Sequence, residues 1–176
     1  MTNNNIYFIA NWKMFGSIKS VNSLNRVISY SKTKKLKAKI IYCPPYTLIN
    51  TFIDKTKNAN IKIGAQDCHV QPKYGPFTGA ISSKMIKDLK CDFVIIGHSE
   101  TRVENDNKKI NLKIKSALNE KLNVIFCIGE KLSDKRNNKT NAVLKKQLLE
   151  GLKNIKNLKK VLIAYEPVWS IGTGII

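Results

Sequence analysis

A single carboxylate stands at the end of an apolar run near the end of the printed sequence. Residues 161–165 are apolar or aromatic, Glu166 follows them, and Pro167, Gly172 and Gly174 come within the next eight positions. A carboxylate that leaves a buried strand among apolar side chains can act as a general base near neutral pH. Proline and glycine let the following segment hinge, and a closing segment excludes water from a reaction. The pattern therefore predicts a base beneath a lid.

A histidine and a lysine follow two other apolar runs and could complete this chemistry. His98 closes the run 93–97, and Ser99 behind it is a candidate N-cap of a helix. The positive end of a helix dipole disfavours an imidazolium, so His98 could act as a neutral proton donor. Lys13 follows the first apolar run, where a cation could bind an anionic substrate and stabilise an oxyanion. Asn11 could order that lysine or the substrate oxygens.

Together these groups predict a class of reaction. A base, a neutral acid, a cation and a lid suit proton abstraction next to a carbonyl, with the enediolate kept away from water. The amide of Gly172 has no side chain in its way and could bind a phosphate when the lid closes. A Schiff-base aldolase would also use a lysine at a strand end, but it needs that lysine buried among apolar residues. Lys13 instead lies in a polar turn beside Asn11, which disfavours an aldolase. The second histidine, His69, does not directly follow an apolar run as His98 does, so we expect His69 to be structural.

Short apolar runs alternate with amphipathic stretches along the whole chain. Continuous apolar runs are typical of strands buried on both faces, and intervening helices imply parallel βαβ units. We expect strands at residues 6–10, 38–43, 61–65, 91–97, 123–128 and 161–165. Apolar residues at helical intervals predict helices at residues 17–31, 46–55, 84–90, 107–119 and 142–158. The chain is therefore predicted to be an α/β protein.

An open doubly wound sheet and a (β/α)8 barrel would both fit six such units. An open sheet would need a glycine-rich phosphate turn after its first strand, and residues 11–15 contain no glycine. Polar or turn-forming residues follow every predicted strand, as in a barrel, whose active site collects at the carboxyl ends of the strands. We therefore expect one domain over residues 1–176, a (β/α)8 barrel of which about six units are present and which is incomplete at the C-terminus.

The net charge of +19 raises the alternative of a basic polyanion-binding protein. Only 3 of the 31 basic residues are arginine, although arginine is the residue that reads phosphates and bases with two hydrogen bonds. The lysines are spread over the predicted strands, helices and loops alike. We therefore expect a solvated lysine surface with incidental affinity for polyanions, and no dedicated nucleic-acid partner.

The four cysteines are expected to be reduced, buried thiols. Cys43, Cys68, Cys91 and Cys127 show no CxxC spacing, and each lies in or beside an apolar run, which disfavours a disulfide framework or a zinc site. The chain contains no apolar stretch long enough to span a membrane and no visible signal or transit peptide. We expect a cytoplasmic protein.

Six motifs make the sequence similar to the triosephosphate isomerase family. They are FIANWKM at 8–14, GAQD at 64–67, TGAIS at 78–82, IIGHSETR at 95–102, CIGE at 127–130 and AYEPVWSIGTG at 164–174. The resemblance covers residues 7–174 and implies interconversion of dihydroxyacetone phosphate and D-glyceraldehyde 3-phosphate, in glycolysis and gluconeogenesis, without a cofactor or metal. It implies Glu166 as the base, His98 as the electrophile and Lys13 as the cation that binds substrate. Asn11 is implied as the neighbour of Lys13, and Ser99, Glu100 and Cys127 as supporting residues.

The resemblance also implies a homodimer in which the loop around Thr78 and Gly79 reaches the active site of the partner. The family commonly has two arginines after His-Ser-Glu, and an acid after Thr-Gly, where this chain has Thr101 and Ala80. Both partners of the ion pair that the family would form across this interface are thus absent. The dimer could tolerate the loss, because such ion pairs often contribute little free energy. The stretch after Arg102 is short and lacks the usual Phe-Gly-Glu segment.

Proteins similar to this one have eight βα units, whereas this sequence supplies six and ends within the predicted lid. We therefore expect an incomplete sequence of a longer isomerase. If the 176 residues are the whole product, an inactive fragment or a non-enzymatic basic protein remains the alternative.

Overall fold

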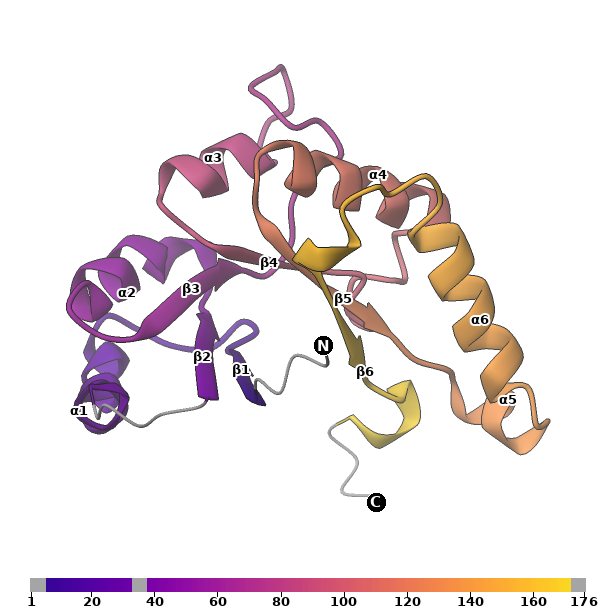
Figure 1. The fold of residues 1–176 in the computed structure, drawn as a ribbon, viewed down its shortest axis with the longest axis horizontal. Helices are drawn as coiled ribbons and strands as arrows, with labels where there is room; N and C mark the ends of the chain where they lie inside the picture. Colours follow the sequence, from indigo (N-terminus) through magenta and orange to yellow (C-terminus); the bar gives the residue numbers. More distant parts are fainter. Residues whose placement is uncertain (1–5, 33–37, 172–176) are drawn as a thin grey trace.

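The computed structural model describes residues 6–32 and 38–171, which form a curved sheet covered by helices on its convex side (Figure 1). Six parallel strands lie in the sheet in the order of the sequence. They are β1 (Ile6–Asn11), β2 (Ala38–Cys43), β3 (Ile61–Ala65), β4 (Phe93–Ile96), β5 (Asn123–Ile128) and β6 (Val161–Tyr165). All six predicted strands are confirmed, with β4 shorter than the run 91–97 because Gly97 takes a positive φ of 79°.

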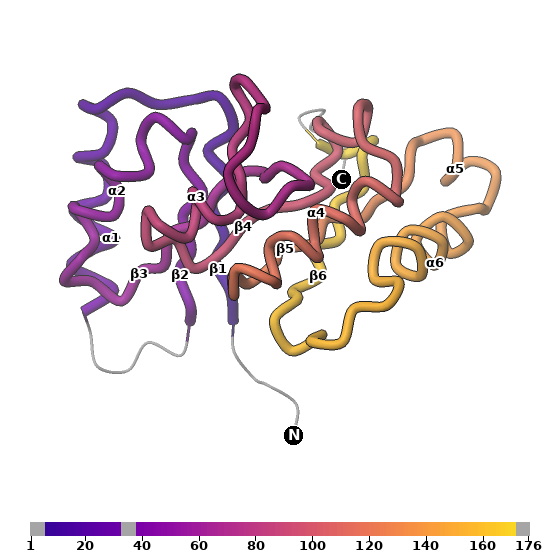
Figure 2. Tube along the Cα trace, turned by 90° about the horizontal axis from the view of Figure 1, so that it is seen from above, coloured from indigo at the N-terminus to yellow at the C-terminus, as the bar shows by residue number. Residues whose placement is uncertain are grey.

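Helices connect the successive strands, as the trace seen from above shows (Figure 2), and one further helix, η4, follows the last strand. They are η1 (Lys19–Leu24), α1 (Asn25–Ser31), η2 (Tyr46–Leu48), α2 (Ile49–Thr56), α3 (Ser83–Asp88), α4 (Asn107–Asn119), α5 (Leu132–Arg136), α6 (Thr140–Gly151), η3 (Leu158–Lys160) and η4 (Val168–Ser170). Side chains cap two of the α-helices, because Ser82 accepts a hydrogen bond from the amide of Met85 and Asp106 accepts one from the amide of Lys109. These caps and the apolar periodicity account for the predicted helices.

Several predicted helices differ from the structure, among them the stretch 46–55, which divides into η2 and α2. The stretch 17–31 divides into η1 and α1, and the last helix ends at Gly151 instead of residue 158. A Cβ at Gly151 would lie 2.4 Å from Cζ of Phe126, so this turn packs directly on the sheet. Beyond it Asn154 has a φ of +60°, which an α-helix cannot contain. Tertiary packing therefore ends α6 two turns before its apolar pattern does.

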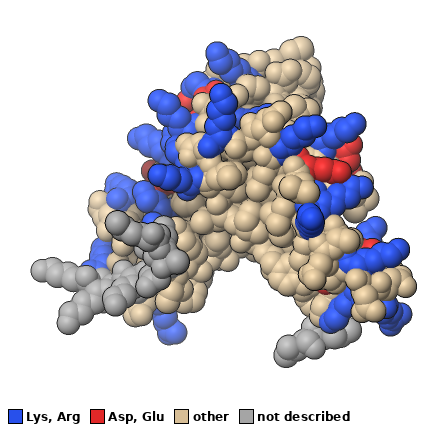
Figure 3. Space-filling view, turned by 45° about the vertical axis from the view of Figure 1, so that its right-hand side comes forward, with Lys and Arg blue, Asp and Glu red and all other residues tan. Residues whose placement is uncertain are grey.

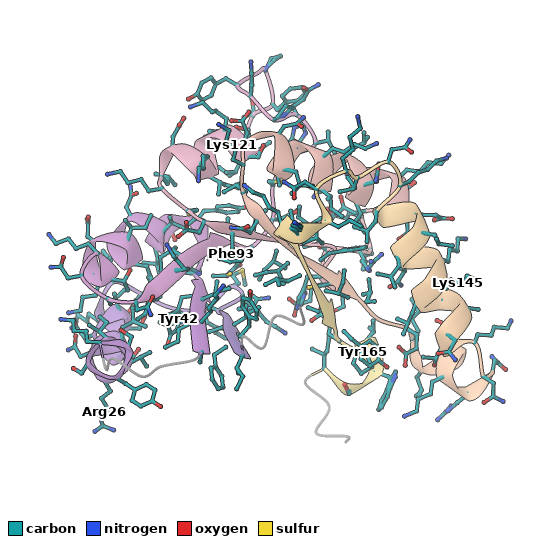
Figure 4. All side chains as sticks on the ribbon, in the orientation of Figure 1. Arg26, Tyr42, Phe93, Lys121, Lys145 and Tyr165 are labelled. Atoms are coloured by element: carbon teal, nitrogen blue, oxygen red, sulfur yellow. The ribbon has the colours of Figure 1, made fainter. Side chains whose placement is uncertain are left out.

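The sheet separates two apolar clusters. The larger lies between the sheet and the helices and includes Phe52, Ile86, Ile114 and Phe126, each at most 1% exposed. The smaller lies on the concave face and consists of Ile41, Cys43, Phe93, Ile95, Ile125 and Cys127. In Figure 4 the labelled Phe93 lies near the middle of the arch. Strands that bury both faces explain why these runs are continuously apolar and do not alternate.

The outer strands β1 and β6 are much more exposed than the central ones. Ile6, Phe8, Ile163 and Tyr165 are between 47% and 62% exposed, whereas all four residues of β4 are buried. In Figure 4 Tyr165 lies at the lower end of β6, on the inside of the arch. These two strands are the edges of the sheet, and apolar edges favour pairing with another chain.

The surface and the cysteines agree with the composition. Lysines and arginines are spread over the visible face in Figure 3 and do not gather into one patch. All four cysteines lie within the described residues, and each is a buried free thiol, as predicted. Among the helices described here, none combines the length and the apolar character needed to cross a membrane.

Candidate active site

The carboxyl ends of β1, β4, β5 and β6 surround a cavity of about 260 Å³. Parallel strands bring their carboxyl ends to one edge of a sheet, which is where a barrel collects its functional side chains. The cavity is lined by Ile9, Asn11, Lys13, Ile95, His98, Ile125, Cys127, Ala164, Glu166 and Ile171. The structure thus brings together five of the predicted residues, Asn11, Lys13, His98, Cys127 and Glu166, and surrounds them with apolar side chains.

His98 and Glu166 contact each other directly. Nε2 of His98 lies 3.2 Å from Oε2 of Glu166, and the two side chains are 7% and 23% exposed. The backbone N–H of Glu100 donates a hydrogen bond to Nδ1 of His98 at 3.2 Å. An Nδ1 that accepts a hydrogen bond carries no proton, so the ring is neutral and Nε2 carries its single proton toward Glu166. Oε1 of Glu166 is buried and makes no hydrogen bond to the described residues.

The predicted helix N-cap at Ser99 is wrong. Successive turns follow His98, in which the amides of Thr101 and Arg102 donate to the carbonyl of His98, and α4 begins only at Asn107. Ser99 lies in these turns, and a single amide, that of Glu100, replaces the predicted helix dipole beside the ring. The neutral His98 that the sequence predicts therefore has a different physical cause.

The loop that carries Lys13 is fixed by side-chain hydrogen bonds. Lys13 has a φ of +52°, a conformation that costs a non-glycine residue free energy and is often found at functional sites. Oδ1 of Asn11 accepts a hydrogen bond from the amide of Lys13 at 3.0 Å. Nε2 of Gln66 donates to the carbonyls of Lys13 at 2.8 Å and Cys43 at 2.9 Å. Asn11 therefore orders Lys13, as predicted, but its side chain binds the backbone amide of Lys13 and not the ammonium.

The ammonium of Lys13 is paired with a carboxylate. Its Nζ lies 2.9 Å from Oε1 of Glu100, and the two side chains are 33% and 56% exposed. An ion pair this accessible to water contributes little free energy, so an anionic substrate could compete for the ammonium. Oε2 of Glu100 is also 3.5 Å from Nδ1 of His98, but the amide of Glu100 already uses that nitrogen. Glu100 thus joins the cation to the histidine.

The thiol of Cys127 contacts the carboxylate of the proposed base, Glu166. Burial raises the pKa of the Cys127 thiol, and the charge of Glu166 and contact with its carboxylate raise it further. The thiol therefore stays neutral beside the carboxylate. The guanidinium of Arg102 donates to the carbonyl of Cys127 at 2.9 Å. The sequence pointed to Cys127 only through the resemblance, and gave Arg102 no role.

A second buried carboxylate holds the start of the predicted lid. Glu130 is 1% exposed, and its Oε1 accepts a hydrogen bond from Nε1 of Trp169 at 2.9 Å. The hydroxyl of Tyr165 donates to both oxygens of Glu130, each at 3.2 Å, and Nζ of Lys135 lies 3.4 Å from the centre of the Trp169 ring. Glu130 and Gln66 were visible in the sequence only as polar residues at strand ends. Gly172, predicted to bind phosphate, lies outside the described residues.

The loop predicted to form a dimer contact projects from the top of the molecule in Figure 1, between β3 and α3. Gly79 has a φ of +81°, and nothing lies within 4 Å of the position that a Cβ would take there.

Thr101 accepts a hydrogen bond at its carbonyl from the side chain of Asn105, and its hydroxyl donates to the carbonyl of His98. No group of three or more side chains that could bind a metal lies within residues 6–32 and 38–171.

The chain matches the family model for triosephosphate isomerase over residues 6–176. It is 45% identical over 170 residues to the triosephosphate isomerase of Dictyoglomus thermophilum, which covers 94% of this chain and 68% of the relative. It is 40% identical over 169 residues to that of Clostridium tetani, covering 93% of this chain and 65% of the relative.

The crystal structure of triosephosphate isomerase from Bartonella henselae superposes with a TM-score of 0.84 at 36% identity. The match covers 93% of this chain and 68% of that structure. The predicted fold, a (β/α)8 barrel of which six units are present, is confirmed. The chain spans about two thirds of the length of these relatives.

Proposed function

Because the chain belongs to the triosephosphate isomerase family, we propose that the protein interconverts dihydroxyacetone phosphate and D-glyceraldehyde 3-phosphate, as an aldose–ketose isomerase of glycolysis and gluconeogenesis. One observation carries the proposal. A neutral His98 directs its Nε2 proton at Oε2 of Glu166 across 3.2 Å, in the cavity that Lys13 also lines. Base, acid and cation thus meet where one small substrate would contact all three.

In the proposed reaction Glu166 removes a proton from the carbon next to the carbonyl of the substrate. The carbonyl oxygen takes the place of Glu166 as acceptor from Nε2 of His98, which frees Oε2 to bind the proton. As negative charge develops on that oxygen, the Nε2–H of His98 and the ammonium of Lys13 stabilise the enediolate. His98 gives its Nε2 proton to that oxygen and takes the proton of the hydroxyl on the adjacent carbon, which becomes the new carbonyl. Glu166 then returns its proton to the former carbonyl carbon, so that both Glu166 and His98 are regenerated.

The substrate phosphate and the lid complete the proposal. Gly172 is proposed to donate its amide to the phosphate when the segment after η4 closes, and closure would keep the enediolate from water. Lys13 is proposed to leave Glu100 for the substrate, because their ion pair is exposed to solvent. Ser99, Glu100 and Cys127 are proposed to support the three groups that contact substrate.

We further propose a cytoplasmic homodimer that forms through the loop around Thr78 and Gly79. Large apolar residues on this loop support the proposal, since Tyr74 and Phe77 are 69% and 42% exposed. Exposed apolar groups of this kind mark contact surfaces between proteins. Gly79 contributes a tip without a side chain, which allows close approach to a partner.

The test is a steady-state assay of triose phosphate interconversion with the purified protein. Glu166→Gln removes the base and should lower kcat by a factor of about 10² to 10⁴. Lys13→Ala should raise KM and lower kcat, because the cation interacts with both the substrate and the enediolate. Lys145→Ala is the matched control, since Lys145 is an exposed lysine on α6, away from the cavity.

Wild-type rates in both site variants would contradict the proposed function. Isomerase activity that disappears in Glu166→Gln would exclude the inactive fragment and the non-enzymatic basic protein.

A further inference from the structure

A half-buried cation, Arg102, lies next to the strand end that binds the backbone of the proposed base. The guanidinium of Arg102 packs with Cζ 6.0 Å from the centre of the Phe126 ring. Its Nη2 donates to the carbonyl of Cys127, and its Nη1 donates to Oδ1 of Asn107, both at 2.9 Å. Its Nε is buried and makes no hydrogen bond to the described residues. Within those residues no carboxylate forms an ion pair with Arg102.

Among the described residues, the hydrogen bonds of Arg102 reach a carboxylate only through the side chain of Asn107. Nδ2 of Asn107 donates to Oε2 of Glu150 on α6 at 2.8 Å. The side chain of Asn107 therefore accepts from Arg102 at one end and donates to Glu150 at the other. The orientation of the guanidinium depends on this relay, because Asn107 supplies one of its two hydrogen-bonded contacts.

On its other side Arg102 contacts the end of β5, the strand that pairs with β6, which Glu166 follows. The amide of Glu166 donates to the carbonyl of Ile128 at 2.9 Å, one residue after the carbonyl that Arg102 binds. Gly97 allows the close approach, because a Cβ there would lie 3.2 Å from the carbonyl oxygen of Cys127 and 3.4 Å from Nη2. A displacement of the Cys127 carbonyl would therefore move the Cys127 thiol that contacts Glu166. It would also move the neighbouring carbonyl of Ile128, which accepts from the amide of Glu166.

The charge of Arg102 also acts on this region. Burial lowers the pKa of Arg102, while the negative charge of Glu166 opposes that shift. The opposition means that the carboxylate of Glu166 and the guanidinium attract each other across the end of β5.

We infer that Arg102 is a positioning residue for Glu166, oriented by the Glu150–Asn107 relay. The inference rests on the proposed isomerase reaction and deepens it. Arg102 contacts neither the cavity nor the substrate, and it acts by fixing the end of β5.

Asn107→Ala removes the relay and leaves the guanidinium with one hydrogen bond. We expect kcat to fall by about tenfold, the loss that one hydrogen bond to a charged group implies, with KM nearly unchanged. The matched control is Asn119→Ala, an exposed asparagine at the other end of α4, which should keep the wild-type kcat. A merely structural role would lower the urea midpoint while leaving kcat per folded molecule unchanged.

The double variant Asn107→Asp/Glu150→Gln provides the rescue. It exchanges the amide and the carboxylate of the relay, keeps the net charge, and leaves Arg102 an acceptor at the same place. We expect it to restore most of the kcat lost in Asn107→Ala. A kcat in Asn107→Ala equal to that of wild type, or a double variant no better than Asn107→Ala, would overturn the inference.

A readout that needs no activity separates this inference from the proposed function. In crystal structures, the distance from Nε2 of His98 to Oε2 of Glu166 should lengthen beyond hydrogen-bond reach in Asn107→Ala and return to the wild-type value in the double variant. An inactive wild-type protein would contradict the proposed function, while an unchanged distance in Asn107→Ala would contradict the positioning role.

Discussion

The centre of the sheet and its two outer strands are built differently. Strand β4 is buried throughout, and β5 is buried at every residue after Asn123, whereas residues of β1 and β6 reach 62% and 53% exposure. The proposed catalytic groups divide along the same line. His98 follows the central β4, while Lys13 and Glu166 follow the exposed β1 and β6.

The difference teaches how exposed strands can present groups at defined positions. Side chains and carbonyls from inside the sheet hold the loops of the outer strands. Gln66, after β3, binds the carbonyl of Lys13, and the carbonyl of Ile128 in β5 accepts from the amide of Glu166. The outer strands contribute the chemistry, and the central strands determine where it lies.

Alkaline pH should act on the centre first and give the largest effect. Burial raises the pKa values of Cys43, Cys68 and Cys91 to about 12 each, and neither outer strand contains a cysteine. The unfolded thiols ionise near pH 8.5, so the unfolded chain loses these protons first and the folded state loses stability as pH rises above that value. We expect the free energy of unfolding to fall by about 2 kcal/mol per thiol between about pH 8 and pH 10, as measured by urea unfolding.

Cys91→Ala should recover about a quarter of that alkaline loss, since it removes one of the four buried thiols whose pKa is raised, Cys127 being the fourth. The same loss in this variant as in wild type would show that other groups control the alkaline transition.

Truncating one phenylalanine in the centre and one at an edge should separate the two regions next. Phe126→Ala removes a ring that is 0% exposed, and should cost about 3–5 kcal/mol. Phe8→Ala removes a ring that is 62% exposed, and should change stability by no more than about 0.5 kcal/mol. Urea unfolding monitored by circular dichroism measures both, and equal losses would break the distinction.

Gln66→Ala tests whether the centre positions an outer strand. Without the amide, the carbonyl of Lys13 loses its donor, and the strained backbone at Lys13 can relax. We expect kcat/KM for triose phosphates to fall by about 10- to 100-fold, with the urea midpoint little changed. Gln71→Ala, at an exposed glutamine of the projecting loop, is the control and should keep the wild-type kcat/KM.

A charge on an outer strand should have the smallest effect on stability. Ile163→Lys places an ammonium on the edge strand β6, where the side chain is 47% exposed, and should change the free energy of unfolding by about 0.5 kcal/mol or less. It should reduce concentration-dependent aggregation, because edge charges oppose strand pairing. Light scattering measures the aggregation, and unchanged aggregation in Ile163→Lys would show that the outer strands do not cause it.

Local patterns predicted the strands well and the helix ends poorly. The runs at 38–43, 61–65, 123–128 and 161–165 match the observed strands because short, mostly apolar runs are typical of parallel strands. The run 161–165 has this pattern although β6 is an exposed edge strand. The last helix ended early because Gly151 packs on Phe126, a contact between residues far apart in the sequence. No pattern within the helix contains that information.

The sequence by itself determined the alternation of strands and helices and the chemical types at the strand ends, because periodicity and residue type are local properties. Only the tertiary structure decided the tautomer of His98, which depends on the Glu100 amide, and the place of Arg102 behind Glu166. Both follow from hydrogen-bond directions, which take their values only when the chain has folded. The fold thus converted a set of suitable residues into one geometry.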